Sequence, residues 1–285
     1  MSANRQKVRV VTDTTAVLPE EYTRAHSVEV IPQVILFGEK SYLEDKEMTF
    51  EQFIDALKQS EELPKTAAPP IASAEEAFRA QLKHADTVLA IHPSSEVSGT
   101  VRSATVAREQ SFPDADIRVL DTRHIGANLA TLVKVAVEMA EAGATGDEIL
   151  ERLHAMIPRG RVYFLVDTLE YLQKGGRIGA ASALLGTALN IKPILSMEDG
   201  KIAAFEKVRT HRKALMRLKE IAREQIQDPG TAYLSVGHAD RLDDAHKLAA
   251  ELEDIFDISG IPVYNMGASI TTHAGPGVLK IAFFK

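Results

Sequence analysis

The first half of the chain alternates short apolar runs with longer segments in which apolar residues recur at helical spacing. Runs rich in Val, Ile and Leu are typical of buried strands. They predict strands over 8–12, 28–37, 87–91 and 117–120. Strands that alternate with helices indicate a largely parallel sheet covered by helices on both faces.

The helices between these strands carry start and stop signals. A Ser or Thr followed three residues later by Glu or Gln is a capping box, in which two side chains bind free N–H groups of the first turn. Such pairs occur at Thr49 with Gln52, Ser73 with Glu76, and Thr145 with Glu148. A long helix around 130–142 is expected to end at Gly143, because glycine is common just after a helix.

Pro158-Arg159-Gly160 is the predicted boundary between two α/β domains, 1–158 and 159–285. Asp199-Gly200 predicts a hairpin in the second domain, because Asp-Gly suits tight turns. The second domain is therefore expected to hold a mixed sheet. Its strands are predicted over 162–166, 191–197, 202–205, 233–236, 262–266 and 279–284, and its helices over 212–226 and 242–256.

A hydroxyl-rich loop, Ser-Ser-Glu-Val-Ser-Gly-Thr over 94–100, lies between the strand at 87–91 and a helix predicted over 101–110. Backbone N–H groups at a helix start are unpaired and carry partial positive charge. Together with the side-chain hydroxyls they predict a site for a small anion. The alternative is that Ser98 only caps the helix.

Composition narrows the function classes. The 285-residue chain has 45% hydrophobic and 26% charged residues, as globular proteins do, and its formal charge of −7 argues against a nucleic acid partner. The absence of cysteine excludes disulfides and thiolate metal sites. No apolar stretch is typical of a signal peptide or a membrane span, so we expect a soluble cytoplasmic protein.

Other patterns point less clearly to chemistry. Ser98 and His273 invite comparison with a serine hydrolase, but the nucleophile elbow requires glycines where Glu96 and Thr100 stand. The turn over 174–177 lacks the phosphate-loop layout, and no other nucleotide motif occurs. The histidines have no metal-ligand spacing, so no metal or cofactor is expected.

Several motifs occur in the order and spacing of a known family. The most specific are Leu169-Glu170-Tyr171-Leu172 followed by Gly175-Gly176-Arg177, and the turn Ser98-Gly99-Thr100. Further matching segments lie at 12–19, 30–32, 42–45, 65–69, 103–104, 121–122, 191–195, 199–200, 207–209 and 273–277. On these residues the chain resembles the DegV family over its full length. Departures at Ala67, Ala68, Val101 and Ala274 leave a thinner polar shell than the family pattern has.

The resemblance implies a two-domain, DegV-like (EDD-type) α/β fold and the role of a fatty-acid-binding subunit of bacterial fatty acid kinase. Such a subunit binds a long-chain fatty acid and presents its carboxyl to a separate ATP-binding subunit. It then carries the acyl phosphate toward phospholipid synthesis, and a transient contact with a membrane surface is compatible with this role. The subunit itself is not an enzyme, so no catalytic residue is expected.

The resemblance also implies roles for particular residues. Thr66, Ser98, Gly99 and His273 are expected at the carboxylate, Thr100, Arg177 and Gly275 in the tunnel or behind it, and Lys207 and Arg209 at the partner. Ala183, Leu184, Leu185 and Leu189 are candidates for the tunnel wall, although core packing explains them equally well. Two other functions stay open: an acyl hydrolase that uses Ser98 and His273, and a regulatory protein that senses a lipid or another small acid.

Overall fold

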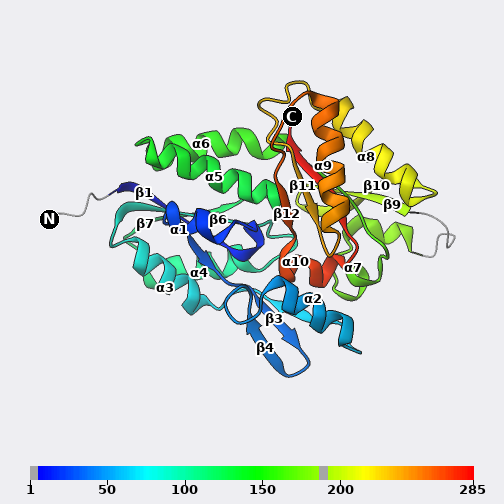
Figure 1. Ribbon diagram of the computed structural model, residues 1–285. Coiled ribbons are helices and arrows are strands. Elements are labelled where there is room, and N and C mark those ends of the chain that lie inside the picture. Colours follow the sequence, from blue (N-terminus) through cyan, green and yellow to red (C-terminus); the bar gives the residue numbers. More distant parts are fainter. Residues whose placement is uncertain (1–5, 186–191) are drawn as a thin grey trace.

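Three β-sheets run through the part of the chain that the computed structural model describes, residues 6–185 and 192–285 (Figure 1). The first sheet has parallel strands in the order β2-β1-β6-β7. This confirms the parallel sheet predicted for the first half of the chain. Its strands are β1 (Gln6–Asp13), β2 (Glu29–Ile31), β6 (Ala85–His92) and β7 (Asp116–Asp121).

Helices cover both faces of this sheet (Figure 1). Val88 and Ala90 of β6 pack with α3 and α4, whereas Leu89 and Ile91 pack with α5 and α6. Successive side chains of a strand point to opposite faces, so an unbroken apolar run needs two layers of helices. The helices of this half are α1 (Glu20–Ala25), α3 (Ile71–Gln81), α4 (Thr100–Ser111), α5 (Ala127–Glu141) and α6 (Gly146–Met156), with the 3-10 helices η1 (Thr14–Ala16) and η2 (Ile157–Arg159).

The second sheet is mixed, in the order β10-β9-β8-β13-β11-β12, and only its β11–β12 pair is parallel. One face packs on α8 and α9, and the other, with Val162 and Phe164, packs against α7 and α10. The predicted α/β fold is confirmed. The strands are β8 (Gly160–Leu165), β9 (Lys192–Glu198), β10 (Lys201–Val208), β11 (Ser235–His238), β12 (Val263–Asn265) and β13 (Leu279–Phe284). The helices are α7 (Glu170–Lys174), η3 (Gly179–Leu184), α8 (His211–Gln225), α9 (Leu242–Phe256) and α10 (Gly267–Ala274).

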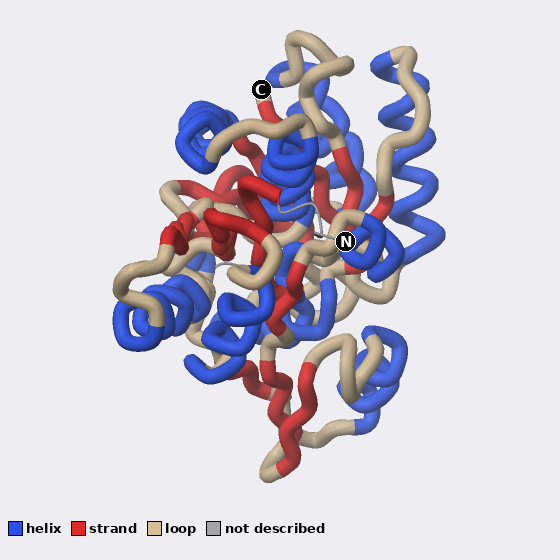
Figure 2. The backbone as a smooth tube through the Cα atoms, turned by 90° about the vertical axis from the view of Figure 1, so that its left-hand side faces the viewer, coloured by secondary structure: helices blue, strands red, loops and turns tan. Residues whose placement is uncertain are grey.

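A small antiparallel sheet was not predicted from the sequence. It consists of β3 (Val34–Phe37), β4 (Lys40–Leu43) and β5 (Lys65–Ala67), and it packs beside α2 (Phe50–Gln59). Figures 1 and 2 show this unit below the two larger sheets. The strand predicted over 28–37 is wrong as one element, because Pro32, which has no N–H to donate, separates β2 of the first sheet from β3 of the small one.

Helix starts test the capping predictions. The boxes at Thr49 and Thr145 are confirmed, with both reciprocal hydrogen bonds formed. The box at Ser73 is wrong, because α3 already begins at Ile71 after Pro70. α5 ends at Glu141, and Gly143 follows with a φ of +88°, as a glycine stop predicts. The strand predicted over 233–236 begins two residues later, at Ser235.

The predicted domain boundary coincides with a change of sheet. All strands of the first sheet precede Pro158, and β8 of the second sheet begins at Gly160. Contacts nevertheless cross this point, since Phe284 packs in the apolar cluster of β1 and α5. The division at 158/159 therefore stays a prediction. Within the described residues, the structure contains no helix that is both long and apolar enough to cross a bilayer.

Candidate ligand-binding pocket

A pocket lies between the second sheet, α10, β5 and the loop after β6. Its empty volume, counted out into the open mouth, is about 860 Å³. Most of its wall is apolar. The apolar lining residues are Ala68, Val97, Ile125, Val162, Phe164, Leu172, Met197, Ile202, Met266, Ile270 and Ala274.

Polar groups from four separate segments meet at one part of this wall. Thr66 Oγ1 lies 2.7 Å from Nε2 of His273, which joins β5 to the last turn of α10. The Arg177 guanidinium donates to the backbone carbonyls of Val97, at 3.2 Å, and Gly175, at 2.8 Å. Thr66, Ser98, Gly99, His273 and Arg177 all line the pocket, so the structure brings these predicted residues together.

His273 is neutral at physiological pH. Burial, and then the positive charge of Arg177, lower its pKa to about 4. Its Nδ1 is buried and has no hydrogen-bond partner among the described residues. The ring can therefore orient a polar ligand group by hydrogen bonding, but it does not offer a fixed positive charge.

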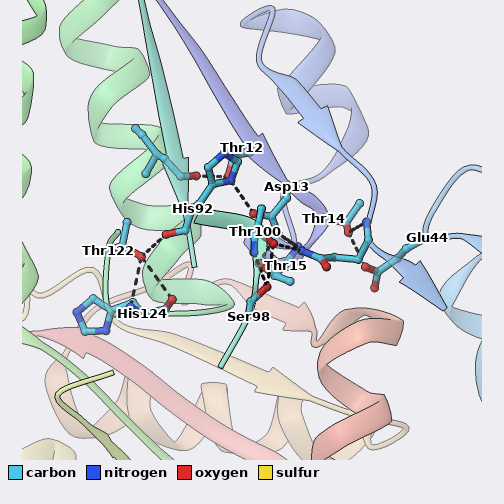
Figure 3. Close-up of polar contacts among 12 residues, drawn as sticks. Thr12, Asp13, Thr14, Thr15, Glu44, His92, Ser98, Thr100, Thr122 and His124 are labelled. Atoms are coloured by element: carbon cyan, nitrogen blue, oxygen red, sulfur yellow. Dashed lines mark hydrogen bonds and ion pairs between the residues drawn. The ribbon is translucent and has the colours of Figure 1, made fainter. Parts of the chain in front are cut away.

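Ser98 lies one residue before the N-cap of α4, which is Gly99 (Figure 3). Its Oγ is 2.8 Å from Thr100 Oγ1 and also accepts the Thr100 backbone N–H at 3.3 Å. Gln33 Nε2 donates to Thr100 Oγ1 at 2.8 Å, which leaves the Thr100 hydroxyl proton free for Ser98. Ser98 Oγ then accepts twice, and its own proton can point to a ligand.

The support for this arrangement continues into the core. Gln33 Nε2 also donates to Asp13 Oδ1 at 3.1 Å, which fixes the orientation of the amide. Asp13 further accepts from the Thr15 hydroxyl at 2.6 Å and lies 2.9 Å from His92 Nδ1. The Asp13 and His92 side chains are completely buried. Sequence reasoning assigned no role to Asp13, Gln33 or His92, although Asp13 lies among threonines at the end of a buried strand and within the segment 12–19 that matches the family.

Other predicted residues lie outside the pocket wall. Thr100 is buried behind Ser98. Gly275, with a φ of +83°, ends α10 where a Cβ would lie 2.6 Å from the Tyr171 ring. Lys207 and Arg209 are exposed near the end of β10 and are not among the lining residues.

None of the predicted tunnel-wall residues that the structure describes lines the pocket. Leu184 packs in the core, Leu185 is exposed, and Ala183 is not part of the wall. Leu189 lies outside the described residues. Ser98 and His273 form no hydrogen bond with each other in the described part of the chain, since His273 Nε2 is bound to Thr66. No group of acidic, histidine or cysteine side chains there has metal-site geometry.

Comparison with known proteins identifies the family to which this fold and pocket belong. A sequence model of the DegV family, described as an uncharacterised protein of that family, matches residues 7–285. The chain therefore belongs to the DegV family. A DegV domain-containing protein of Halalkalibacterium halodurans is 34% identical over 279 residues, which span 98% of each chain.

Solved structures extend the comparison. The crystal structure of DegV from Bacillus subtilis, described as a fatty acid binding protein, has 34% identity and a TM-score of 0.89, covering 98% of this chain and 100% of that one. A stearic acid-binding protein from Eubacterium ventriosum has 26% identity and a TM-score of 0.88, covering 98% of each chain. DegV homologues of this chain thus bind fatty acids.

Proposed function

We propose that this protein binds a long-chain fatty acid in the pocket, with the carboxylate at Thr66, Ser98, the Gly99 N–H and His273. The observation that carries the proposal is the combination of an apolar wall with hydroxyl donors gathered at one part of it. The fatty acids named for related structures support the same ligand class.

The energetics of such a ligand suit the pocket. Each buried CH₂ contributes about 0.8 kcal/mol, so some fifteen methylenes offer on the order of 12 kcal/mol before the costs of association and ordering are subtracted. A buried carboxylate without donors would oppose binding strongly. The free proton of Ser98 and the Thr66–His273 pair supply such donors.

We further propose that the protein acts as a carrier subunit and not as an enzyme. It would present the carboxyl to a separate ATP-binding kinase subunit and carry the acyl phosphate onward, with Lys207 and Arg209 at the partner surface. The chain has no nucleotide motif of its own, which fits this division of labour. A cytoplasmic location, no cofactor other than the bound lipid, and transient contact with a membrane surface belong to the same proposal.

The first test is mass spectrometry of an organic extract of the purified protein. A tightly held lipid survives purification, so we expect a long-chain fatty acid at about one per chain. An extract without acyl species, from a protein that also takes up no added fatty acid, would contradict the proposal. Turnover of activated esters would favour the hydrolase, and a ligand-dependent change in a complex without a kinase would favour the lipid sensor.

The second test concerns the carboxylate. Ser98→Ala and Thr66→Ala each remove a hydrogen bond to a charged acceptor, so each is expected to weaken fatty acid binding by about 1.5–3 kcal/mol. Titration with the acid and with its methyl ester separates this effect from chain burial, because the ester carries no charge. Ser95→Ala is the matched control, since the Ser95 hydroxyl binds Asp121 and does not line the pocket. If both pocket variants bind the acid as the parent does, the carboxylate lies elsewhere.

A further inference from the structure

Lys280 is a buried lysine in the wall of the pocket. It lies on β13, between β8 and β11 in the second sheet, and only 4% of its surface is exposed. Ile281 and Phe283 of the same strand point to the opposite face of the sheet, where they pack with α8 and α9. Lys280 instead lines the pocket with Phe164 and Ile270. An ammonium group therefore faces a cavity whose wall is mostly apolar.

Two glycines make room for this side chain. Gly237 of β11 lies opposite Lys280 of β13, and a Cβ on this glycine would lie 2.2 Å from Lys280 Cε. A Cβ on Gly126, just before α5, would lie 2.5 Å from Lys280 Nζ. A Cβ at Gly237 would collide with the lysine stem, and one at Gly126 would displace the ammonium, so the side chain extends into space that these two glycines leave open.

Over residues 6–185 and 192–285, no hydrogen bond or ion pair joins the ammonium of Lys280 to another residue. Burial lowers its pKa from 10.5 to about 8, so at neutral pH most molecules still carry the charge. A buried charge without a partner is costly, and a lysine ammonium has three donors and no acceptor. The slot therefore favours a ligand that brings an oxygen acceptor.

Lys280 is separate from the groups expected at the carboxylate. The charge that lowers the pKa of His273 is that of Arg177, whereas the charge of Lys280 acts on His238 at the end of β11. The residue of α10 beside Gly126 and the lysine is Ile270, about one helical turn before His273. We therefore expect a ligand held at Thr66 and Ser98 to meet Lys280 along its chain and not at its carboxylate.

We propose that Lys280 is a second polar anchor in the pocket, which selects an acyl chain bearing an oxygen function along its length, such as a hydroxy fatty acid. This inference rests on the proposed fatty acid function and names the substrate class of that site. A hydroxyl or carbonyl oxygen on the chain accepts a hydrogen bond from the ammonium, while an unsubstituted chain leaves the ammonium desolvated and unpaired.

The test compares stearic acid with a set of its monohydroxy positional isomers, titrated into the delipidated parent and into Lys280→Met. Methionine keeps much of the length and removes the charge. The parent is expected to bind at least one hydroxy isomer about tenfold or more tightly than stearic acid, because hydrogen bonds to charged groups reach this size. Lys280→Met is expected to lose this preference and to bind stearic acid at least as tightly as the parent.

Controls distinguish this role from others. Lys83→Met makes the same replacement at an exposed lysine outside the pocket and should leave both affinities unchanged. The ligand-free thermal midpoint of Lys280→Met should equal or exceed that of the parent, since an unpaired buried charge is removed; a clear fall would indicate a structural role and overturn the proposal. Loss of stearic acid binding in Lys280→Met would place the carboxylate at Lys280, which also overturns it.

The remaining outcomes separate this inference from the function on which it rests. A parent that binds stearic acid but shows the same ratio of affinities as Lys280→Met for every isomer refutes the second anchor alone. A parent that binds none of these acids refutes both the second anchor and the fatty acid function.

Discussion

At the scale of single residues, the pocket depends on a hydrogen-bond network that runs from its wall into the core. Ser98 offers its proton to a ligand when Thr100 donates to it, and Gln33 favours this arrangement by donating to Thr100 Oγ1 from the other side. Gln33 in turn is held by Asp13, a carboxylate buried with His92 at the end of β1 and β6. We infer that Gln33 is a positioning residue for Ser98.

Gln33→Met tests this role. Loss of the amide lets the Thr100 hydroxyl turn away from Ser98, so we expect fatty acid affinity to fall about three- to tenfold, on the scale of one neutral hydrogen bond. In the Gln33→Met background, Ser98→Ala should cost clearly less than it costs alone, because groups in one network are not additive. Gln81→Met, a buried glutamine bound to Glu29 and outside the pocket, is the control. Additive effects would show that Gln33 does not act through Ser98.

At the scale of elements, the sequence predicted those features that depend on interactions between residues close together in the chain. The boxes at Thr49 and Thr145 and the hairpin at Asp199-Gly200 involve residues close in sequence, and all three are confirmed. The capping box predicted at Ser73 is wrong because α3 begins earlier, directly after Pro70. The hydrogen bond between Asp13 and His92 joins residues 79 positions apart, so no local pattern could predict it.

The small sheet shows the same limit. An apolar run broken by Pro32 is compatible with one bent strand or with two strands, and only the pairing of β3 with β4 and β5 decides between them. The family resemblance predicted Thr66 and His273 as site residues, although the small sheet itself was not predicted. The structure adds the reason that they meet, since β5 carries Thr66 to the last turn of α10.

The β9–β10 hairpin gives a prediction at this scale. Its turn docks on the loop that leads to Ser98, where the Ser94 hydroxyl donates to the Gly200 carbonyl at 2.9 Å. Gly200 has a φ of +79°, and a Cβ there would lie 2.3 Å from Ser94 Oγ. Gly200→Ala is therefore expected to lower the free energy of unfolding by about 2 kcal/mol or more and to weaken fatty acid binding, because the hairpin strands carry Met197 and Ile202 of the pocket wall.

Gly38→Ala is the matched control for the hairpin. Gly38 also has a positive φ, +57°, but nothing lies within 4 Å of the position of its Cβ. It should show only the backbone cost of about 1 kcal/mol and leave ligand affinity unchanged. Denaturant unfolding and fatty acid titration measure both quantities. Equal effects of the two substitutions would mean that the docking of the hairpin on Ser94 contributes nothing.

At the scale of the whole molecule, the charge distribution bears on the proposed partner. The chain has a formal charge of −7, yet β10, at the edge of the second sheet, carries exposed Lys201 and Lys207 and is followed by exposed Arg209. Lys201 is paired with Glu96 at 3.2 Å. In the described part of the chain, Lys207 and Arg209 have no ion pair, so both are available to an acidic or phosphorylated surface.

Arg209→Ala is the test of the partner surface. A guanidinium pairs bidentately with a carboxylate or phosphate, which alanine cannot do. Because Arg209 is exposed and outside the pocket, we expect fatty acid affinity and stability to stay close to those of the parent, while phosphorylation of the bound fatty acid by the proposed kinase subunit falls. Arg152→Ala on α6 removes an exposed arginine from another face and should leave phosphorylation unchanged.

Arg209→Lys should restore phosphorylation only in part, since an ammonium keeps the charge but not the two-pronged geometry. If Arg209→Ala abolishes lipid binding, or leaves phosphorylation as in the parent, Arg209 is not the contact, and the fatty acid function stands or falls on the tests of Ser98 and Thr66.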